Sequence, residues 1–156
     1  MRAATFLLLL ALAACARPAP APESFRLAGA PIASTTRGEP QALAGEWQVA
    51  AAYPGPGPGA GQPVRVSFGP SGGMALGWQG GGWQLTPAGP GRWEGPEGPL
   101  WLLWADESFR IAVLGTPDGS FGFILTRPAV AGRGDLLTAA REMLDFNGYD
   151  LTRLPG

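Results

Sequence analysis

The sequence of 156 residues contains no histidine and no lysine, and its single cysteine is Cys15. Histidine, lysine and cysteine supply most of the general bases and nucleophiles of enzymes, and histidine and cysteine supply most zinc ligands. A serine triad needs an imidazole that this chain does not have. We therefore expect no enzymatic activity, no metal site and no cofactor.

The remaining candidates for chemistry are carboxylates and glycines. Glu94 with Glu97, and Asp106 with Glu107, would each make an acid/base couple, but both pairs fall in predicted turns and are interpreted as solvated side chains. The run at residues 80–82 is three glycines, and neither a helix nor a lysine follows it as a phosphate-binding loop requires. Carboxylate-only catalysis is the weakest of the functional hypotheses.

The chain also has no cluster of positive charge. Eleven arginines are scattered among twelve acidic residues, so neither nucleic acid nor anionic head groups are predicted as partners. Glycine (25) and proline (17) are abundant enough to suggest disorder. However, all six tryptophans lie between Trp47 and Trp104 among alternating apolar segments, which predicts a folded domain there.

One long apolar run is present, from Phe6 to Leu12, after Arg2. It is too short to span a bilayer and predicts a secretory signal at residues 1–14. Two alanines and Cys15 follow, an arrangement that resembles the lipobox of bacterial lipoproteins. The resemblance implies cleavage before Cys15, its acylation, and anchorage of the protein to a membrane. The alternative is an ordinary signal peptide with an incidental cysteine.

Residues 15–40 are predicted to be the lipidated cysteine, a stiff Pro/Ala tether and an irregular arm. Ala16, not aspartate, follows the cysteine. By the sorting rule of enteric bacteria, this resembles outer-membrane lipoproteins that face the periplasm. The folded domain is then expected at residues 41–156.

Within this domain, short alternating apolar segments are separated by turns rich in glycine and proline, a pattern typical of β-structure. Trp47, Val49, Ala51 and Tyr53 would share one face of the first strand. About eight strands at this spacing predict an up-and-down barrel or a sandwich, and the barrel is favoured because it has no exposed edge. The expected strands lie near residues 45–53, 64–68, 74–78, 83–85, 93, 100–104, 109–113 and 121–125.

A single helix is predicted after the strands. Asp135 is expected to cap its start and Asn147-Gly148 to end it. One apolar stripe predicts packing against the outside of the barrel. The stripe consists of Leu136, Leu137, Ala140, Met143 and Leu144.

The same domain resembles the lipocalins, particularly their bacterial outer-membrane lipoprotein branch. Gly45 and Trp47 resemble the first lipocalin motif, Asp106 stands where lipocalins carry a Thr-Asp-Tyr turn, and the segment around Arg127 resembles the third motif. The resemblance implies an all-β, eight-stranded antiparallel barrel with one C-terminal α-helix outside. It also implies that Trp47 closes one end with Arg127 across its ring, so these motif residues would be structural.

The lipocalin resemblance implies a small hydrophobic ligand in the barrel mouth, of the fatty acid or lysophospholipid class. Arg65 and Arg110 are candidate partners for its head group, although their alternation with apolar neighbours predicts an outward position. The residues predicted to line the site, or simply to fill the core, are Val49, Phe68, Met74, Trp78, Leu102 and Phe123.

The alternative is a structural or interaction lipoprotein whose barrel is filled by side chains. Only 83 residues run from Gly45 to Arg127, fewer than is usual in lipocalins, and tryptophans are in surplus. An enclosed void of about 300 Å³ or more would favour the carrier, and aromatic filling would favour the alternative.

Overall fold

The structure is a computed structural model and describes residues 23–35 and 37–155. The predictions for the signal at residues 1–14 and for acylated Cys15 therefore lie outside the described residues.

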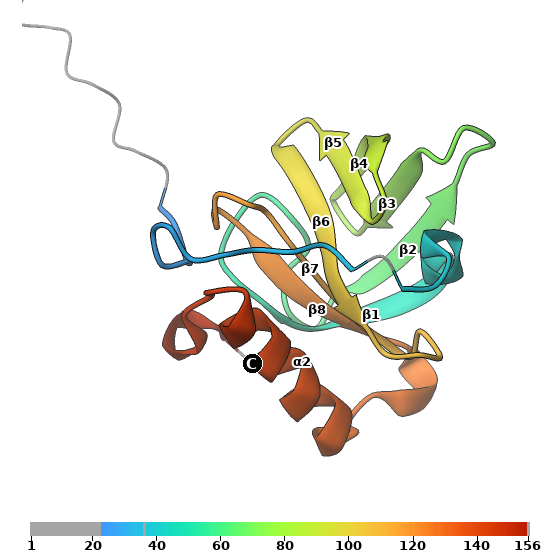
Figure 1. The fold of residues 1–156 in the computed structure, drawn as a ribbon. Helices are drawn as coiled ribbons and strands as arrows, with labels where there is room; N and C mark the ends of the chain where they lie inside the picture. The colour runs from blue at the N-terminus through green and yellow to red at the C-terminus, as the bar shows by residue number, and fades with distance from the viewer. Residues whose placement is uncertain (1–22, 36, 156) are drawn as a thin grey trace, which may run out of the picture.

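Eight antiparallel strands form a closed barrel in sequence order (Figure 1). β1 pairs with both β2 and β8, so the sheet has no free edge. This confirms the predicted up-and-down barrel. The strands are β1 (Gly45–Ala52), β2 (Pro63–Phe68), β3 (Met74–Trp78), β4 (Gly81–Gly89), β5 (Arg92–Gly95), β6 (Gly98–Ala105), β7 (Ile111–Gly115) and β8 (Gly122–Thr126).

One α-helix, α2 (Gly134–Phe146), packs on the outside of the barrel against β6 and β7, as predicted (Figure 1). Three short 3₁₀ helices complete the described chain: η1 (Pro40–Leu43), η2 (Pro128–Val130) and η3 (Leu151–Arg153). In the part of the chain that the structure describes, no helix is both long enough and apolar enough to cross a membrane.

The barrel wall separates two hydrophobic cores, because side chains alternate between the two faces of a strand. The inner core fills the barrel. The outer core lies between the wall, α2 and the arm that precedes the barrel. Ala140 and Leu144 of the predicted stripe are fully buried in this outer core, and the other three stripe residues pack against it.

A bulge in β1 divides its residues between the two cores. The pairing of β1 with β8 shifts between Val49 and Ala51, and such a bulge reverses the faces that follow it. Trp47, Val49 and Ala52 belong to the inner core, whereas Ala51 and Tyr53 belong to the outer core. The prediction that Ala51 and Tyr53 share a face with Trp47 was therefore wrong.

A second register shift lies in β6, between Leu102 and Trp104. Leu102 faces the interior, whereas Trp101 and Trp104 pack against the outer core. Only part of the tryptophan surplus thus fills the barrel.

The segment before β7 also differs from its predicted pattern. Phe109 has a positive φ of 49° and lies in the β6–β7 turn, not in a strand. Its ring joins the inner core, while Ile111 and Val113 face the outer core. The prediction of a strand from residue 109 was therefore wrong at its start, because the turn includes Phe109 and β7 begins at Ile111.

The start of α2 corrects another prediction. Arg133 occupies the N-cap position and has no capping hydrogen bond from its side chain. Asp135 lies in the first turn, where its carboxylate pairs with the Arg133 guanidinium at 2.8 Å and its charge is favourable beside the helix dipole. The end was predicted correctly: Asn147 is the C-cap, and Gly148 follows with a φ of 82°.

The arm at residues 23–35 runs along the outside of the barrel (Figure 1). Phe25 stacks on Tyr53 with ring centroids 4.7 Å apart. The Arg26 guanidinium donates to the carbonyls of Asn147 and Pro117, and the Thr35 backbone N–H donates to Leu102 O at 2.8 Å. The arm is therefore tied both to the β7–β8 turn and to β6.

Candidate functional site

Trp47 and Arg127 meet at the end of the barrel where β1 begins. The Arg127 guanidinium carbon lies 3.8 Å from the centroid of the Trp47 ring, a cation–π geometry. The indole N–H donates to Leu43 O at 2.6 Å, which holds η1 across the same end. We call this end the closed end.

The guanidinium of Arg127 joins four segments of the closed end by hydrogen bonds. It donates to the carbonyls of Phe109 (3.2 Å), Glu46 (3.2 Å), Ala42 (2.8 Å) and Ala44 (3.0 Å). Burial lowers the pKa of Arg127, but these carbonyl partners accept from the charged form. One side chain thus connects η1, β1, the β6–β7 turn and β8.

The structure explains why residue 45, two positions before Trp47, is a glycine. Its φ of 114° is rarely adopted by other residues, and a Cβ there would lie 2.9 Å from Nη1 of Arg127. A side chain at this position would displace the arginine.

Asp106 fastens the β6–β7 turn at the same end. Its Oδ1 accepts from the backbone N–H groups of Arg110 (2.6 Å) and Ile111 (3.0 Å), and its Oδ2 accepts from Arg110 Nε at 2.7 Å. Burial alone would raise the pKa of Asp106, but the hydrogen bonds from Arg110 and Ile111 together outweigh it and lower the pKa. All four residues assigned to lipocalin motifs lie at the closed end.

The six residues predicted to line a ligand site all face the barrel interior. Val49, Met74, Leu102 and Phe123 are at most 1% exposed. Phe68 and Trp78 are half-buried against the same inner core. They pack against one another and against other side chains of the inner core. In this structure they therefore fill the core and do not line an open site.

Aromatic rings continue this packing toward the opposite end. Trp83 contacts Trp78 edge-on at 5.2 Å and Phe121 edge-on at 6.0 Å, and Phe121 lies 5.3 Å from Phe123. Rings in such edge-to-face arrangements leave little space between them. The interior is filled rather than hollow.

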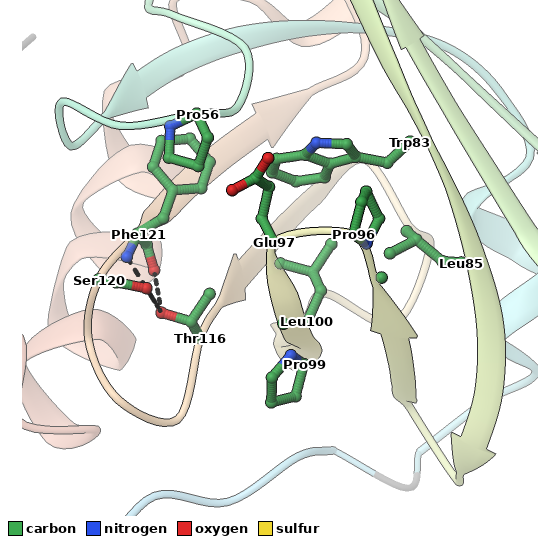
Figure 2. Close-up of a pocket in the computed structure, with 12 residues that line it drawn as sticks. Pro56, Trp83, Leu85, Pro96, Glu97, Pro99, Leu100, Thr116, Ser120 and Phe121 are labelled. Atoms are coloured by element: carbon green, nitrogen blue, oxygen red, sulfur yellow. Dashed lines mark hydrogen bonds between the residues drawn. The ribbon is translucent and has the colours of Figure 1, made fainter. Parts of the chain in front are cut away.

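A small pocket remains at the end opposite to Trp47, which we call the mouth (Figure 2). Its volume is about 280 Å³ when counted to its open side, but only about 10 Å³ admits a water-sized sphere, about one water molecule. The void of about 300 Å³ expected of a carrier is therefore absent from the described barrel. The pocket is lined by Pro56, Trp83, Leu85, residues 95–99, Leu100, Thr116, Ser120 and Phe121.

The β1–β2 connection covers the mouth, and we call residues 53–62 the mouth loop. A Cβ on Gly57 would lie 2.2 Å from the Phe121 ring and 2.8 Å from the Trp83 ring, so only glycine lets the loop rest this closely on them. Prolines occupy positions 54, 56 and 58 and carry no N–H. Between Tyr53 and Gly59, no backbone hydrogen bond to another described residue holds the loop.

Comparison of the sequence with protein-family models and with curated proteins gave no match. Among solved structures, the chain is similar to apocrustacyanin C1, apocrustacyanin C2 and lobster apocrustacyanin A1. Each is 20% identical to this chain over 74% of its length and over 76%, 76% and 77% of the other chain, with TM-scores of 0.55, 0.55 and 0.56. The chain has the lipocalin fold. At this identity, the similarity concerns the fold alone.

The charges of this lipocalin fold are distributed unequally between its ends. Four connections surround the mouth: residues 53–62, 79–80, 96–97 and 116–121. Their only charged side chains are the carboxylates of Glu97 and Asp118.

The arginines considered as head-group partners lie elsewhere in the lipocalin fold. Arg65 projects from the outer face of β2 and pairs with Glu46 at 2.5 Å, and Arg110 pairs with Asp106 at the closed end. Neither lines the mouth pocket.

Two open grooves, each of about 520 Å³, lie outside the barrel of the lipocalin fold and share Arg37 and Trp104. One extends along the β6–β7 turn, and the other reaches Met143 and Phe146 on α2. Within residues 23–35 and 37–155, no group of three or more side chains is arranged to hold a metal ion.

Sequence reasoning missed the residues of the mouth pocket. Leu85 lies in the middle of β4, whereas Leu100 and Phe121 each lie near a strand end that adjoins a mouth connection. The signal that would have found them is their position relative to alternate turns, because in an up-and-down barrel every second connection lies at the same end.

Proposed function

We propose that this protein binds one small hydrophobic ligand at the mouth of its lipocalin-fold barrel. The observation that carries the proposal is the apolar pocket between Trp83 and Phe121. The mouth loop covers this pocket, and between Tyr53 and Gly59 it makes no backbone hydrogen bond to another described residue. Because about 10 Å³ is free, binding requires the mouth loop to move aside. The ligand then replaces the contacts of the loop with the two rings.

The filled interior limits the depth of binding. With Phe123 and Leu102 buried in the barrel, only the end of one apolar chain fits beneath the loop. Burying roughly 200 Å² of apolar surface would contribute about 5 kcal/mol before the costs of association. We therefore expect weak binding of a single-chain amphiphile, of the fatty acid or lysophospholipid class.

We further propose that the protein is anchored to the outer membrane through acylated Cys15 and faces the periplasm. The lipobox-like sequence and Ala16 support this location. Cys15 lies eight positions before Glu23, and a fully extended chain of that length spans at most roughly 29 Å. The described chain then meets the β7–β8 turn at the mouth, where Phe25 N–H donates to Gly119 O at 2.7 Å. The mouth is thus the end of the barrel that the tether can bring close to lipid.

A second candidate is an interaction lipoprotein without a ligand. The aromatic filling of the barrel favours it, as do the outer grooves beside Trp104. Phe146, which lines one of these grooves, is 74% exposed, and an apolar groove at the surface is a feature of contact sites.

Intrinsic tryptophan fluorescence tests the two candidates. The full-length chain carrying Cys15→Ser, which cannot be acylated, is titrated with a lysophospholipid and with dodecanoate below their micellar concentrations. The binding proposal predicts a saturable change in emission that is reduced in Trp83→Phe. An emission that does not change saturably with either lipid would contradict binding and favour the second candidate. Mass spectrometry of the wild-type N-terminus tests the anchor separately.

A further inference from the structure

The charged side chains of the four connections around the mouth are all negative. Glu97 lies in the β5–β6 turn and lines the pocket together with Trp83 and Pro56 (Figure 2). Asp118 lies in the β7–β8 turn, whose Thr116, Ser120 and Phe121 line the same pocket. The mouth loop and the β3–β4 turn contain no charged residue.

Asp118 is held in its ionised form by its own turn. Its Oδ1 accepts from the Ser120 N–H at 3.0 Å and from the Ser120 hydroxyl at 2.8 Å. Burial raises the pKa of Asp118, but these hydrogen bonds outweigh burial and lower it. The carboxylate therefore contributes a full charge at neutral pH.

The nearest arginines do not neutralise the pocket. Arg26 donates from its guanidinium to the carbonyls of Pro117, Asn147 and Ala30, and it is not among the residues that line the pocket. Arg153 pairs with Glu23 on the outer side of the arm. An anionic head group at the pocket would face Glu97 with no cation among the lining residues, which is unfavourable.

We infer that the mouth pocket selects single-chain amphiphiles with a cationic head group and discriminates against carboxylate head groups. The inference rests on the proposed function and narrows its ligand class: it keeps the single apolar chain and disfavours the carboxylate head group of a fatty acid. The apolar chain lies against Leu85, Leu100 and Phe121. An ammonium group at the pocket opening is attracted both by the Glu97 carboxylate and by the face of the Trp83 indole.

The experiment compares three probes of equal chain length: dodecyltrimethylammonium, dodecanoate and dodecanol. Each is titrated below its micellar concentration into the full-length Cys15→Ser chain, and tryptophan emission reports binding. We expect the cationic probe to bind about tenfold more tightly than dodecanoate, with dodecanol between them.

Two exposed glutamates supply matched variants. Glu97→Gln removes the charge that lines the pocket, and Glu94→Gln removes a charge on β5 that does not line it. Both side chains are exposed, so neither change should affect folding. We expect Glu97→Gln to reduce the preference for the cationic probe over dodecanoate severalfold, whereas Glu94→Gln keeps both this preference and the affinity for dodecanol.

The failure of this inference is distinguishable from the failure of the proposed function. Saturable binding of all three probes with equal affinity, or a preference that Glu97→Gln leaves unchanged, would overturn the inference while binding itself stands. If none of the probes binds saturably, the proposed function fails as well. A preference lost equally in Glu94→Gln and Glu97→Gln would reduce the effect to general surface charge and would also overturn the inference.

Discussion

The two ends of this barrel are closed by different physical means. At the closed end, Arg127 stacks on Trp47 and donates hydrogen bonds to four backbone carbonyls. At the mouth, Gly57 rests on Phe121 through van der Waals contact, and between Tyr53 and Gly59 the loop makes no backbone hydrogen bond within residues 23–35 and 37–155. Opening the closed end would break the contact of Arg127 with the Trp47 ring and leave the buried indole N–H of Trp47 without its acceptor, Leu43 O, whereas opening the mouth would expose mainly apolar surface.

This difference determines which end can accept a ligand. An unpaired buried polar group costs about 1–3 kcal/mol, and more if it is charged. Exposing a modest apolar contact costs about 25 cal/mol per Å², and a bound apolar chain restores most of that loss. We therefore expect the barrel to open at the mouth, where apolar contacts hold the loop, and not at the closed end, where hydrogen bonds hold η1 and β1.

The largest expected effect comes from truncating the indole at each end. Trp47→Ala should lower the free energy of unfolding by about 3–5 kcal/mol, because it leaves a cavity beneath Arg127 and removes the hydrogen bond to Leu43. Trp83→Ala should cost less, about 2–3 kcal/mol, because the mouth loop can settle into the space. Urea unfolding followed by circular dichroism measures both. Equal losses would show that the two ends are equally rigid.

The arginine of the closed end should have the next largest effect. Arg127→Ala should cost about 2–3 kcal/mol through loss of the ring stack and of the hydrogen bonds to four carbonyls. Arg127→Lys keeps the charge but not the planar fork of donors, so it should restore less than half of the loss. Full recovery in the lysine variant, measured by the same urea unfolding, would mean that charge alone matters at this end.

A smaller effect is expected from a methyl group under the mouth loop. Gly57→Ala places a Cβ against Phe121 and Trp83, so the loop should lift at a cost of about 1 kcal/mol. Trp83 then becomes more exposed, which shifts tryptophan emission to longer wavelength and increases its quenching by acrylamide.

Gly59→Ala is the matched control for this prediction. A Cβ there would find its nearest neighbour, Gln62 Oε1, at 4.0 Å, which is ordinary contact. We expect its emission and quenching to equal those of the wild type. If Gly57→Ala behaves in the same way as Gly59→Ala, the loop does not rest on the rings in solution.

The smallest expected effect concerns acid stability. The pKa of Asp106 is lowered in the folded state, so its contribution is complete above the unfolded pKa of about 3.9 and is lost as the pH falls through the lower folded value. Asp106→Asn should cost about 1 kcal/mol at pH 7 and should show a smaller further loss below pH 4 than the wild type.

Asp118→Asn provides the comparison at the mouth. Asp118 is exposed, and its carboxylate is bound only within its own turn, to Ser120. We expect this variant to change stability less than Asp106→Asn at every pH, as measured by urea unfolding between pH 2 and pH 7. The reverse order would indicate that the turn at the mouth is the better-fastened end.

The closed end was predictable from the sequence because its parts are local motifs. Gly45 and Trp47 are two residues apart, and Arg127 occupies the end of the last predicted strand. The lipocalin resemblance implied that they meet, and the closed barrel makes the first and last strands neighbours, as that contact requires. The barrel and the outward helix were predicted for a similar reason, from periodicity and turn spacing.

The mouth could not be predicted in the same way. Its lining comes from four separate connections, and no local pattern joins Pro56 to Glu97 or to Phe121. The predicted lining residues, such as Val49 and Phe123, proved to face the interior but to be packed within it. The alternation of apolar and polar residues along a strand predicts which side chains point into the barrel. The empty volume inside the barrel depends on the volumes of all these side chains together, which no single strand specifies.

The sequence by itself determined the period of the strands, the positions of the turns and the helix, and thereby the closed eight-stranded barrel. Only the tertiary structure decided which residues after Val49 and Leu102 face outward, because a bulge shifts the register by one residue and reverses every face that follows. It also decided that the interior is full and that the space open to a ligand lies under the mouth loop. The physical reason is that local periodicity specifies which face of a strand each side chain lies on, whereas the packing of the interior depends on all strands of the barrel together.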